Sequence, residues 1–284
     1  MNEAELGQHA RQVRNITEPI AASVYFSPEA MKGYEGLGLD YFQGYFCSRG
    51  ACLGKAPWSV ICAAFAAFNP AIVKTSVEAG WALTDPEPML AARLAGAEAQ
   101  LQRVLGDPGP EVARATELLL NMVDGADRSG RMLFSGLSLL PQPESAWGAL
   151  WHAADLVREH RGDGHIASWI PHLDSCEVTL LTELAWGLKP RSYSRTRGWA
   201  DEDMNAGQQR LQARGLLDGD QLSDAGRSLR ASIERETDQT VRTVQERLGD
   251  DLDELVRIVS PWAKAVVAAK AYPVDPANQP DIRV

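Results

Sequence analysis

The stretch LQARGLLDGDQLSDAGRSLRASIE, residues 211–234, decides the fold of the last third of this chain. Gly215 ends a helix, and the apolar pair Leu216-Leu217 begins a short strand. Asp218-Gly219 supplies a tight hairpin turn into a second short strand. Ser223-Asp224 then caps a long helix. Helix, two-stranded hairpin and helix in this order predict a winged helix.

Two resemblances support this prediction. Residues from about 175 to 240 resemble winged-helix proteins of the multiple-antibiotic-resistance-regulator type. Four runs resemble a family of uncharacterised actinobacterial helix-turn-helix proteins, in which a helical N-terminal region precedes the winged helix: GYFCSRGACLG (44–54), FNPAIV (68–73), REHRGDGHIA (158–167) and RGWADEDM (197–204). That family tends to place a hydroxyl residue where Ala200 stands, so Asp201 is the expected cap here. The resemblance implies an architecture and no activity.

The remaining sequence predicts helices and almost no strand. Proline or capping residues open most of them, and Gly162-Asp163-Gly164 predicts a break after a helix over 143–160. The expected fold class is all-α with a small two-stranded wing. The expected divisions are a helical domain (1–142), a winged-helix domain (143–248), a C-terminal amphipathic helix (249–272) and a disordered, proline-rich tail (273–284).

Composition limits the classes of function. The net charge of −10 over 284 residues repels nucleic acid and anionic membrane. The N-terminus is too polar for a signal peptide, and Val60–Phe68 is shorter than the ~20 apolar residues of a membrane span. We therefore expect a cytoplasmic protein without a membrane partner. The four cysteines form no CxxC pair, and no nucleotide-binding glycine pattern occurs, so we expect no metal and no cofactor.

The expected recognition helix of the winged helix begins with Asp201-Glu202-Asp203. Three carboxylates at this end would face DNA phosphates, although they also complement the helix dipole. Candidate DNA contacts, if the chain is a regulator, are Arg195, Arg197, Arg210 and Arg214. We interpret the winged helix as a scaffold or dimerisation element, and the amphipathic helix over 252–270 favours a homodimer.

Arg49 is anomalous, because it lies at the middle of an apolar helix face. On a helix of 3.6 residues per turn, Phe42, Tyr45 and Phe46 fall within about 60° of it. A buried guanidinium requires an acceptor. One interpretation is a ligand pocket with Arg49, Tyr45, Phe46, Phe42 and Trp58 as binding residues; the other is an internal salt bridge.

Four of the five histidines lie between His152 and His172. His152 shares a helix face with Asp155 and Glu159, which indicates a solvated face. His160 and His165 have no zinc-site spacing, and they remain candidate general bases on position alone.

Two functional hypotheses follow. The first is a protein that binds a small anionic or aromatic molecule near Arg49, an enzyme of specialised metabolism being one form of it, with a winged helix that does not bind DNA. The second is a ligand-responsive winged-helix regulator, for which nucleic acid is the partner.

Overall fold

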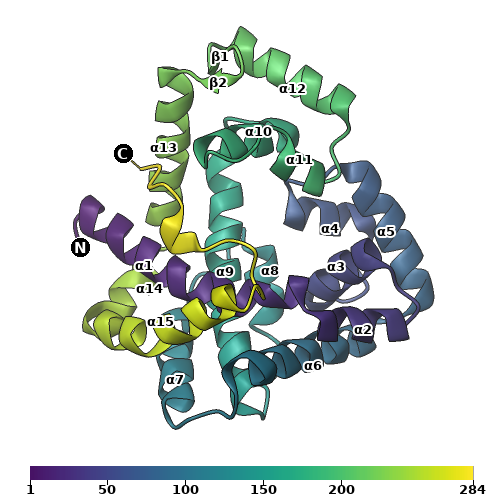
Figure 1. Ribbon diagram of the computed structural model, residues 1–284, viewed down its shortest axis with the longest axis vertical. Helices are drawn as coiled ribbons and strands as arrows, with labels where there is room; N and C mark the ends of the chain where they lie inside the picture. The colour runs from purple at the N-terminus through teal and green to yellow at the C-terminus, as the bar shows by residue number, and fades with distance from the viewer. Residues whose placement is uncertain (284) are drawn as a thin grey trace.

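The computed structural model describes residues 1–283, and it is almost entirely helical (Figure 1). The α-helices are α1 (Glu3–Ala22), α2 (Pro28–Gly36), α3 (Tyr41–Gly50), α4 (Trp58–Phe65), α5 (Pro70–Leu83), α6 (Pro86–Leu105), α7 (Glu111–Val123), α8 (Met132–Leu137), α9 (Ala146–Trp169), α10 (Ser175–Ala185), α11 (Ser192–Thr196), α12 (Asp201–Ala213), α13 (Asp224–Thr240), α14 (Arg242–Leu248) and α15 (Leu252–Ala268). The strands β1 (Leu217–Asp218) and β2 (Gln221–Leu222) form an antiparallel pair. The predicted fold class is confirmed.

Helix α9 is the centre of the larger part of the molecule, which we call the helical body. Helices α1, α6, α7, α8 and α13 all pack against it. Apolar residues cover most of the circumference of its first turns, among them Trp147, Leu150, Trp151 and Leu156, and these four are buried. A helix with so wide an apolar face lies inside a protein, and α9 accordingly runs through the core.

The break predicted at Gly162-Asp163-Gly164 is wrong, because α9 continues without interruption to Trp169. Glycine serves close packing here. A Cβ atom on Gly164 would lie 2.1 Å from the hydroxyl of Thr240, at the end of α13. The Asp163 carboxylate accepts a hydrogen bond from the Phe134 N–H (2.9 Å), so it caps α8, an element distant in sequence.

The winged helix lies at the top of Figure 1, and consists of α10, α11, α12, the β1–β2 hairpin and the start of α13. Pairing of Leu217 with Leu222 shifts the predicted turn by one residue and places Gly219 (φ 58°) at its first central position. The Ser223 hydroxyl accepts from the Gly226 N–H (3.0 Å), which confirms the predicted cap of α13. The small core below the hairpin is built from residues such as Leu181, Met204 and Leu211.

Helix α12 begins differently from the prediction. Ala200 is the N-cap residue and has no side-chain acceptor, while Asp201 is already the first helical residue. The carboxylate of Asp201 pairs with Arg195 on α11, so it does not cap the helix. Asp203 compensates partly, because its carboxylate accepts from the Ala200 N–H at 3.4 Å.

The expected boundary at residue 142 precedes a helix shared by both parts, since α9 contributes Val157 to the body core and Trp169 to the winged-helix core. Helix α15 buries its apolar face, including Leu255 and Ile258, against α1, α6 and α7. That face is therefore not open for a second copy of the chain. The homodimer stays a prediction that rests on no contact described here.

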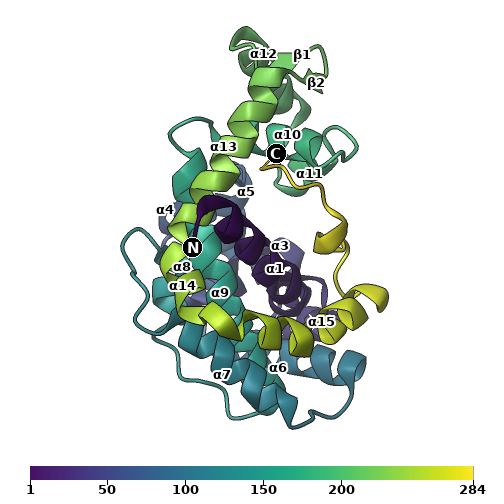
Figure 2. The ribbon, with the colours of Figure 1, turned by 90° about the vertical axis from the view of Figure 1, so that its left-hand side faces the viewer.

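The C-terminal segment 273–283 was expected to be disordered, yet it lies across α1 and reaches α13 (Figure 2). Its backbone is held by arginines, because Arg11 donates to the Gln279 carbonyl (2.7 Å) and Arg14 to the Pro276 carbonyl (3.1 Å). Composition alone predicts disorder because it does not show which donors the fold brings to these carbonyls. No helix in the described part of the chain is long and apolar enough to cross a membrane.

Candidate functional site

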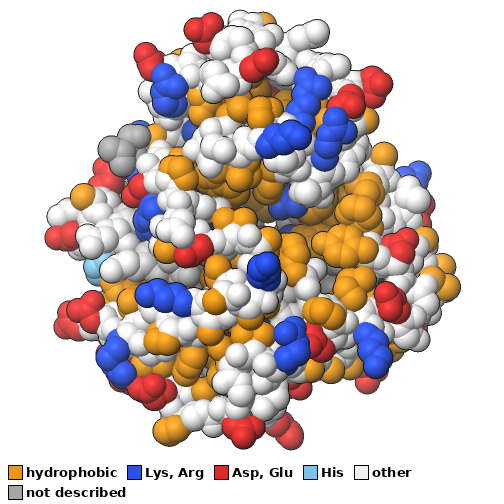
Figure 3. Space-filling view, in the orientation of Figure 1, with side chains coloured by type: hydrophobic (Ala, Val, Ile, Leu, Met, Phe, Trp, Pro, Cys, Tyr) orange, Lys and Arg blue, Asp and Glu red, His pale blue; other side chains and the backbone are white. Residues whose placement is uncertain are grey.

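A cavity of about 750 Å³ lies between the helical body and the winged helix; we call it the central cavity. In Figure 3 the molecule is hollowed between these two parts, and apolar side chains line the hollow. Helices α1, α3, α9, α10 and α13 contribute to its wall, together with the C-terminal segment. Eleven of the twenty Phe, Tyr and Trp residues line it: Tyr25, Phe26, Tyr41, Phe42, Tyr45, Phe65, Phe68, Trp169, Trp186, Tyr193 and Tyr272.

Charged side chains also line the central cavity, and most of them are cations. The arginines are Arg14, Arg49, Arg158, Arg161, Arg197 and Arg230, and the carboxylates are Glu18 and Glu234. A cavity with apolar walls and a surplus of guanidinium groups is complementary to an organic anion. This surplus contrasts with the net charge of −10 of the whole chain.

Arg49 lies in this wall and is paired internally. Its Nε and Nη2 donate to the two carboxylate oxygens of Glu159 at 2.8 and 2.7 Å, a bidentate pair. Its Cζ lies 4.5 Å from the centroid of the Phe65 ring. The internal salt bridge is therefore present, and Arg49 also borders the cavity, where its role toward a ligand stays a prediction.

Glu159 is ionised in this setting. Burial acts to raise its pKa, but the charges of Arg49 and Arg158 outweigh that effect and lower the pKa to about 2. Arg158 donates to Glu159 (2.6 Å) and also to Glu18 (3.1 Å). Arg49 and Arg158 are thus balanced by Glu159 and Glu18, and this cluster contributes no net charge.

The other predicted ligand residues divide into two groups. Tyr45 and Phe42 line the central cavity beside Arg49. Phe46 is fully buried behind them, in edge contact with Phe68 at a centroid distance of 5.0 Å. Trp58 is not among the lining residues, and the ammonium of Lys74 lies over its ring at 5.7 Å. Trp58 begins α4, and it is the opposite end of that helix that contributes Phe65 to the cavity wall.

His165 lines the central cavity and His160 does not. The Nδ1 atom of His165 lies 2.9 Å from the Thr237 hydroxyl. Burial, reinforced by the charge of Arg230, lowers the pKa of His165 to about 3. Burial beside Arg131 lowers the pKa of His160 to a similar value, and its ring packs edge-on against Phe134. Both imidazoles are neutral at neutral pH.

The prediction of a solvated face for His152, Asp155 and Glu159 is wrong: their exposed fractions are 5%, 0% and 1%. Helices pack around α9 on all sides, so its polar stripe is buried and needs internal partners. Asp155 finds one in Arg93 of α6, whose Nη2 donates at 2.9 Å. Sequence analysis did not single out Arg93, since a lone arginine on an amphipathic helix carries no signal of burial.

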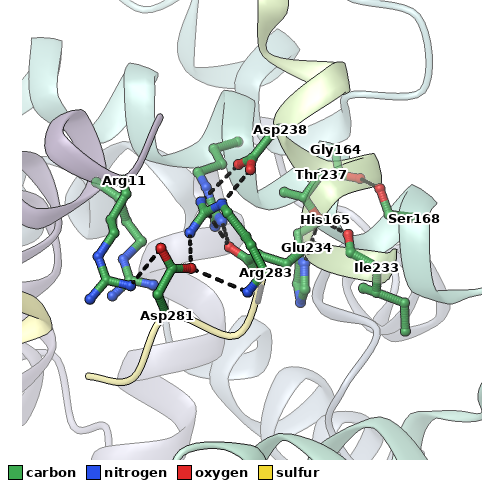
Figure 4. A network of polar contacts seen from close by, with 12 residues as sticks. Arg11, Gly164, His165, Ser168, Ile233, Glu234, Thr237, Asp238, Asp281 and Arg283 are labelled. Atoms are coloured by element: carbon green, nitrogen blue, oxygen red, sulfur yellow. Dashed lines mark hydrogen bonds and ion pairs between the residues drawn. The ribbon is translucent and has the colours of Figure 1, made fainter. Parts of the chain in front are cut away.

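A second polar cluster lies where the C-terminal segment meets α9 and α13 (Figure 4). Glu234 accepts hydrogen bonds from Arg161 and Arg230. Arg283 pairs with Asp238 at 2.9 Å through Nη2, and its Nη2 lies 3.4 Å from Glu234. The segment therefore forms part of the wall at this end of the cavity.

Three of the four candidate DNA contacts are exposed arginines that pair with acids. Arg195 pairs with Asp201, while Arg210 and Arg214 both pair with the buried Glu177 (3.1 Å each). The fourth, Arg197, faces the central cavity instead. Within residues 1–283, no cluster of three or more His, Cys, Asp or Glu side chains has the arrangement of a metal site.

Comparison with known proteins relates the whole arrangement to one family. A family model described as a helix-turn-helix family matches residues 10–273, which include both the helical body and the winged helix. No curated protein and no solved structure matches the chain. Since the matched region covers nearly all of the sequence, the chain belongs to this helix-turn-helix family.

Proposed function

We propose that this protein binds a small organic anion with an aromatic or apolar body in the central cavity. The observation that supports this most directly is the cavity itself, about 750 Å³ with aromatic walls and six arginines, against Glu18 and Glu234 in the lining and Glu159 paired behind it. Ligand sites of drug-sized molecules typically measure ~300–1,000 Å³ and combine apolar walls with a few polar groups. Candidate general bases such as His165 have no assigned substrate, so the proposal extends to binding and not to catalysis.

In this proposal the winged helix acts as one wall of the binding site. Thr182 of α10, Trp186 directly after it and Tyr193 of α11 belong to the cavity lining. Its outward arginines are already paired with acids, and the exposed start of α12 carries three carboxylates. Such a surface weakens the phosphate attraction that supplies non-specific DNA affinity.

A ligand-responsive regulator is the second candidate, and one observation favours it. Most of α12 outside its contacts with α10 is exposed, as a recognition helix must be, and the chain belongs to a helix-turn-helix family. Fluorescence anisotropy with labelled duplex DNA separates the candidates. Affinity that falls steeply between about 50 and 200 mM salt would favour the regulator.

The binding proposal can be tested with 8-anilinonaphthalene-1-sulfonate, a fluorescent aromatic anion. Gly162 lines the cavity in the middle of α9, and a Cβ atom there would meet only the Glu159 carboxylate, at 3.4 Å. Gly162→Leu should therefore fold and fill part of the cavity. We expect it to reduce probe affinity at least about tenfold, which corresponds to ~1.4 kcal/mol.

Gly162→Ala is the matched control, because it adds a Cβ at the same place and leaves most of the cavity open. It should bind the probe as the wild type does. Equal affinity in all three proteins would mean that the probe binds elsewhere, and absence of saturable binding to the wild type would contradict the proposed function.

A further inference from the structure

We propose that Arg197 binds the anionic group of the ligand, which we infer to be a carboxylate or sulfonate on an aromatic body. This inference rests on the proposed function and names the residue that confers its selectivity for charge. It differs from the sequence predictions, in which Arg49 was the candidate arginine for a ligand and Arg197 a candidate DNA contact of a regulator.

Within the described chain, the cavity-lining arginines that form no ion pair are Arg14 and Arg197. Arg49 and Arg158 pair with Glu159, and Arg161 and Arg230 share Glu234. Arg14 donates instead to the Pro276 carbonyl and the Gln279 side chain of the C-terminal segment, so its N–H groups already have acceptors. Among residues 1–283, no carboxylate lies within ion-pair distance of Arg197, and its Nη1 donates to the neighbouring Thr196 hydroxyl (2.9 Å). Because the nearby cluster of Arg49, Arg158, Glu159 and Glu18 is balanced, Arg197 leaves one positive charge at the aromatic end.

The surroundings of Arg197 favour an oxyanion in the plane of its guanidinium. Its Cζ lies 4.3 Å from the centroid of the Tyr193 ring and 4.9 Å from that of Phe68. Ring contacts of this kind occupy the faces of a guanidinium, and the N–H groups at its edge remain to donate. Two such donors match the geometry of a carboxylate or sulfonate, and the aromatic side chains nearby suit a ring attached to it.

The chain holds Arg197 rigidly at this place. Helix α11 ends in a Schellman motif, with Gly198 at φ 78° and the Trp199 N–H donating to the Ser194 carbonyl (3.5 Å). A Cβ atom on Gly198 would lie 2.7 Å from the Ile72 side chain, so only glycine lets α11 approach α5 this closely. The Arg197 carbonyl in turn accepts from the Asn69 N–H (2.9 Å).

The turn that follows α4, which faces Arg197 and Trp199, has an unusual backbone conformation. Ala66, at φ 45°, is the centre of a γ-turn in which the Ala67 N–H donates to the Phe65 carbonyl. The Ala67 carbonyl accepts from the Trp199 indole (3.0 Å), which links the turn to the winged helix. Strained turns of this type persist where surrounding structure holds them, and they cluster at binding sites. This one directs Phe65 and Phe68 to the cavity beside Arg197.

The test compares 2-naphthoate with its neutral isostere 2-naphthamide by isothermal titration calorimetry. We expect the wild-type protein to prefer the naphthoate at least about tenfold, and Arg197→Gln to lose that preference by weakening naphthoate about 10–100-fold while leaving naphthamide unchanged. Arg197→Lys should retain part of the preference, because it keeps the charge but not the planar donors. Arg195→Gln, whose side chain pairs with Asp201 on the outer surface, is the matched control.

The outcomes separate the two proposals. Two results would overturn the role of Arg197 and leave the proposed function intact. In the first, Arg197→Gln still prefers naphthoate. In the second, the wild-type protein shows no preference for naphthoate, although its binding of anilinonaphthalenesulfonate depends on Gly162. Failure of the cavity to bind the fluorescent probe would overturn the proposed function itself. Lost packing against Phe68 would weaken the binding of both naphthalene probes equally, whereas lost recognition of the charge weakens naphthoate alone. The thermal midpoint of Arg197→Gln, measured in parallel, checks that the variant is folded.

Discussion

The helical body and the winged helix differ in their most deeply buried ion pairs. Besides exposed pairs such as Lys55–Asp85, the body contains Arg93–Asp155 and Arg49–Glu159, whose side chains are almost closed to solvent. In the pairs of α10, α11 and α12 at least one side chain is exposed, and in Arg195–Asp201 both are more than half exposed. A buried charge that loses its partner is costly, whereas an exposed pair is screened by water. We therefore expect the buried pairs of the body to contribute to the stability of the fold. The exposed pairs of the winged helix should mainly change the electrostatic field that DNA would meet.

Removing one partner of the deepest pair should have the largest effect. Asp155→Ala leaves Arg93 buried without a carboxylate, since their exposed fractions are 0% and 2%. We expect a loss of about 3–5 kcal/mol in the free energy of unfolding, measured by urea denaturation. Asp201→Ala, in the surface pair of the winged helix, should cost less than about 1 kcal/mol. Similar losses in both variants would remove the distinction between the two regions.

Two glycines of α9 should respond in opposite directions to the same substitution. Gly164→Ala places a Cβ 2.1 Å from the Thr240 hydroxyl and should cost about 1–3 kcal/mol, because α13 has to shift. Gly162→Ala has room for its Cβ and should be neutral or stabilise by up to ~1 kcal/mol through helix propensity. Thermal unfolding of the two variants checks this, and equal destabilisation would argue against a continuous α9.

The buried histidines predict a pH dependence of stability. The folded pKa of His165 and of His160 is lowered to about 3, against 6.5 for the unfolded side chain. Below pH 6.5 the unfolded state therefore binds more protons than the folded one, and stability falls as pH decreases from 6.5 toward 3. His165→Gln keeps a partner for Thr237 and should reduce this slope by ~1.4 kcal/mol per pH unit.

Asp163 opposes this trend. Burial raises its folded pKa to about 7 from 3.8, so the folded state holds the extra proton and this residue lowers stability as pH rises from about 4 to 7. Asp163→Asn should therefore steepen the acid-side loss seen for the wild type. Urea titrations at pH 5, 6 and 7 measure the slope. An unchanged slope in both variants would mean that other groups dominate the titration.

The smallest effect is expected at the start of α12. Replacing Asp201, Glu202 and Asp203 by their amides removes three negative charges that face outward. Non-specific DNA affinity at low salt should rise a few-fold, while stability changes little. Anisotropy titrations with the wild type as reference measure this. A decrease in DNA affinity would show that these carboxylates serve recognition and would favour the regulator.

Local patterns predicted much of this protein because their causes are local. The hairpin between Gly215 and Ser223 depends on turn and capping residues that act within a few positions, and it was found with a shift of one residue. The Arg49 side chain is only 11% exposed, as its place on an apolar face predicted, since helical periodicity determines which residues share a side. The identity of its partner could not be predicted, because Glu159 lies 110 positions away in the sequence.

The errors share a physical cause as well. Gly162 and Gly164 were assigned to a break, and His152 to solvent, because sequence does not show how many neighbours a helix has. The sequence groups Arg197 with three arginines of the outer surface as candidate DNA contacts. In the structure, Gly198 allows α11 to pack closely against α5, and the Arg197 side chain lines the central cavity.

By itself, the sequence determined the helical class, the wing, the cap of α13 and the presence of one arginine that could not be left without an acceptor. Propensity, periodicity and capping act over a few residues, so one sequence is sufficient to predict them. Only the tertiary structure decided where the cavity lies, that Arg49 pairs with Glu159, and that Arg197 lines the cavity without an ion pair among residues 1–283. Those outcomes depend on side chains brought together from helices far apart in the chain, and close packing alone determines which of them meet.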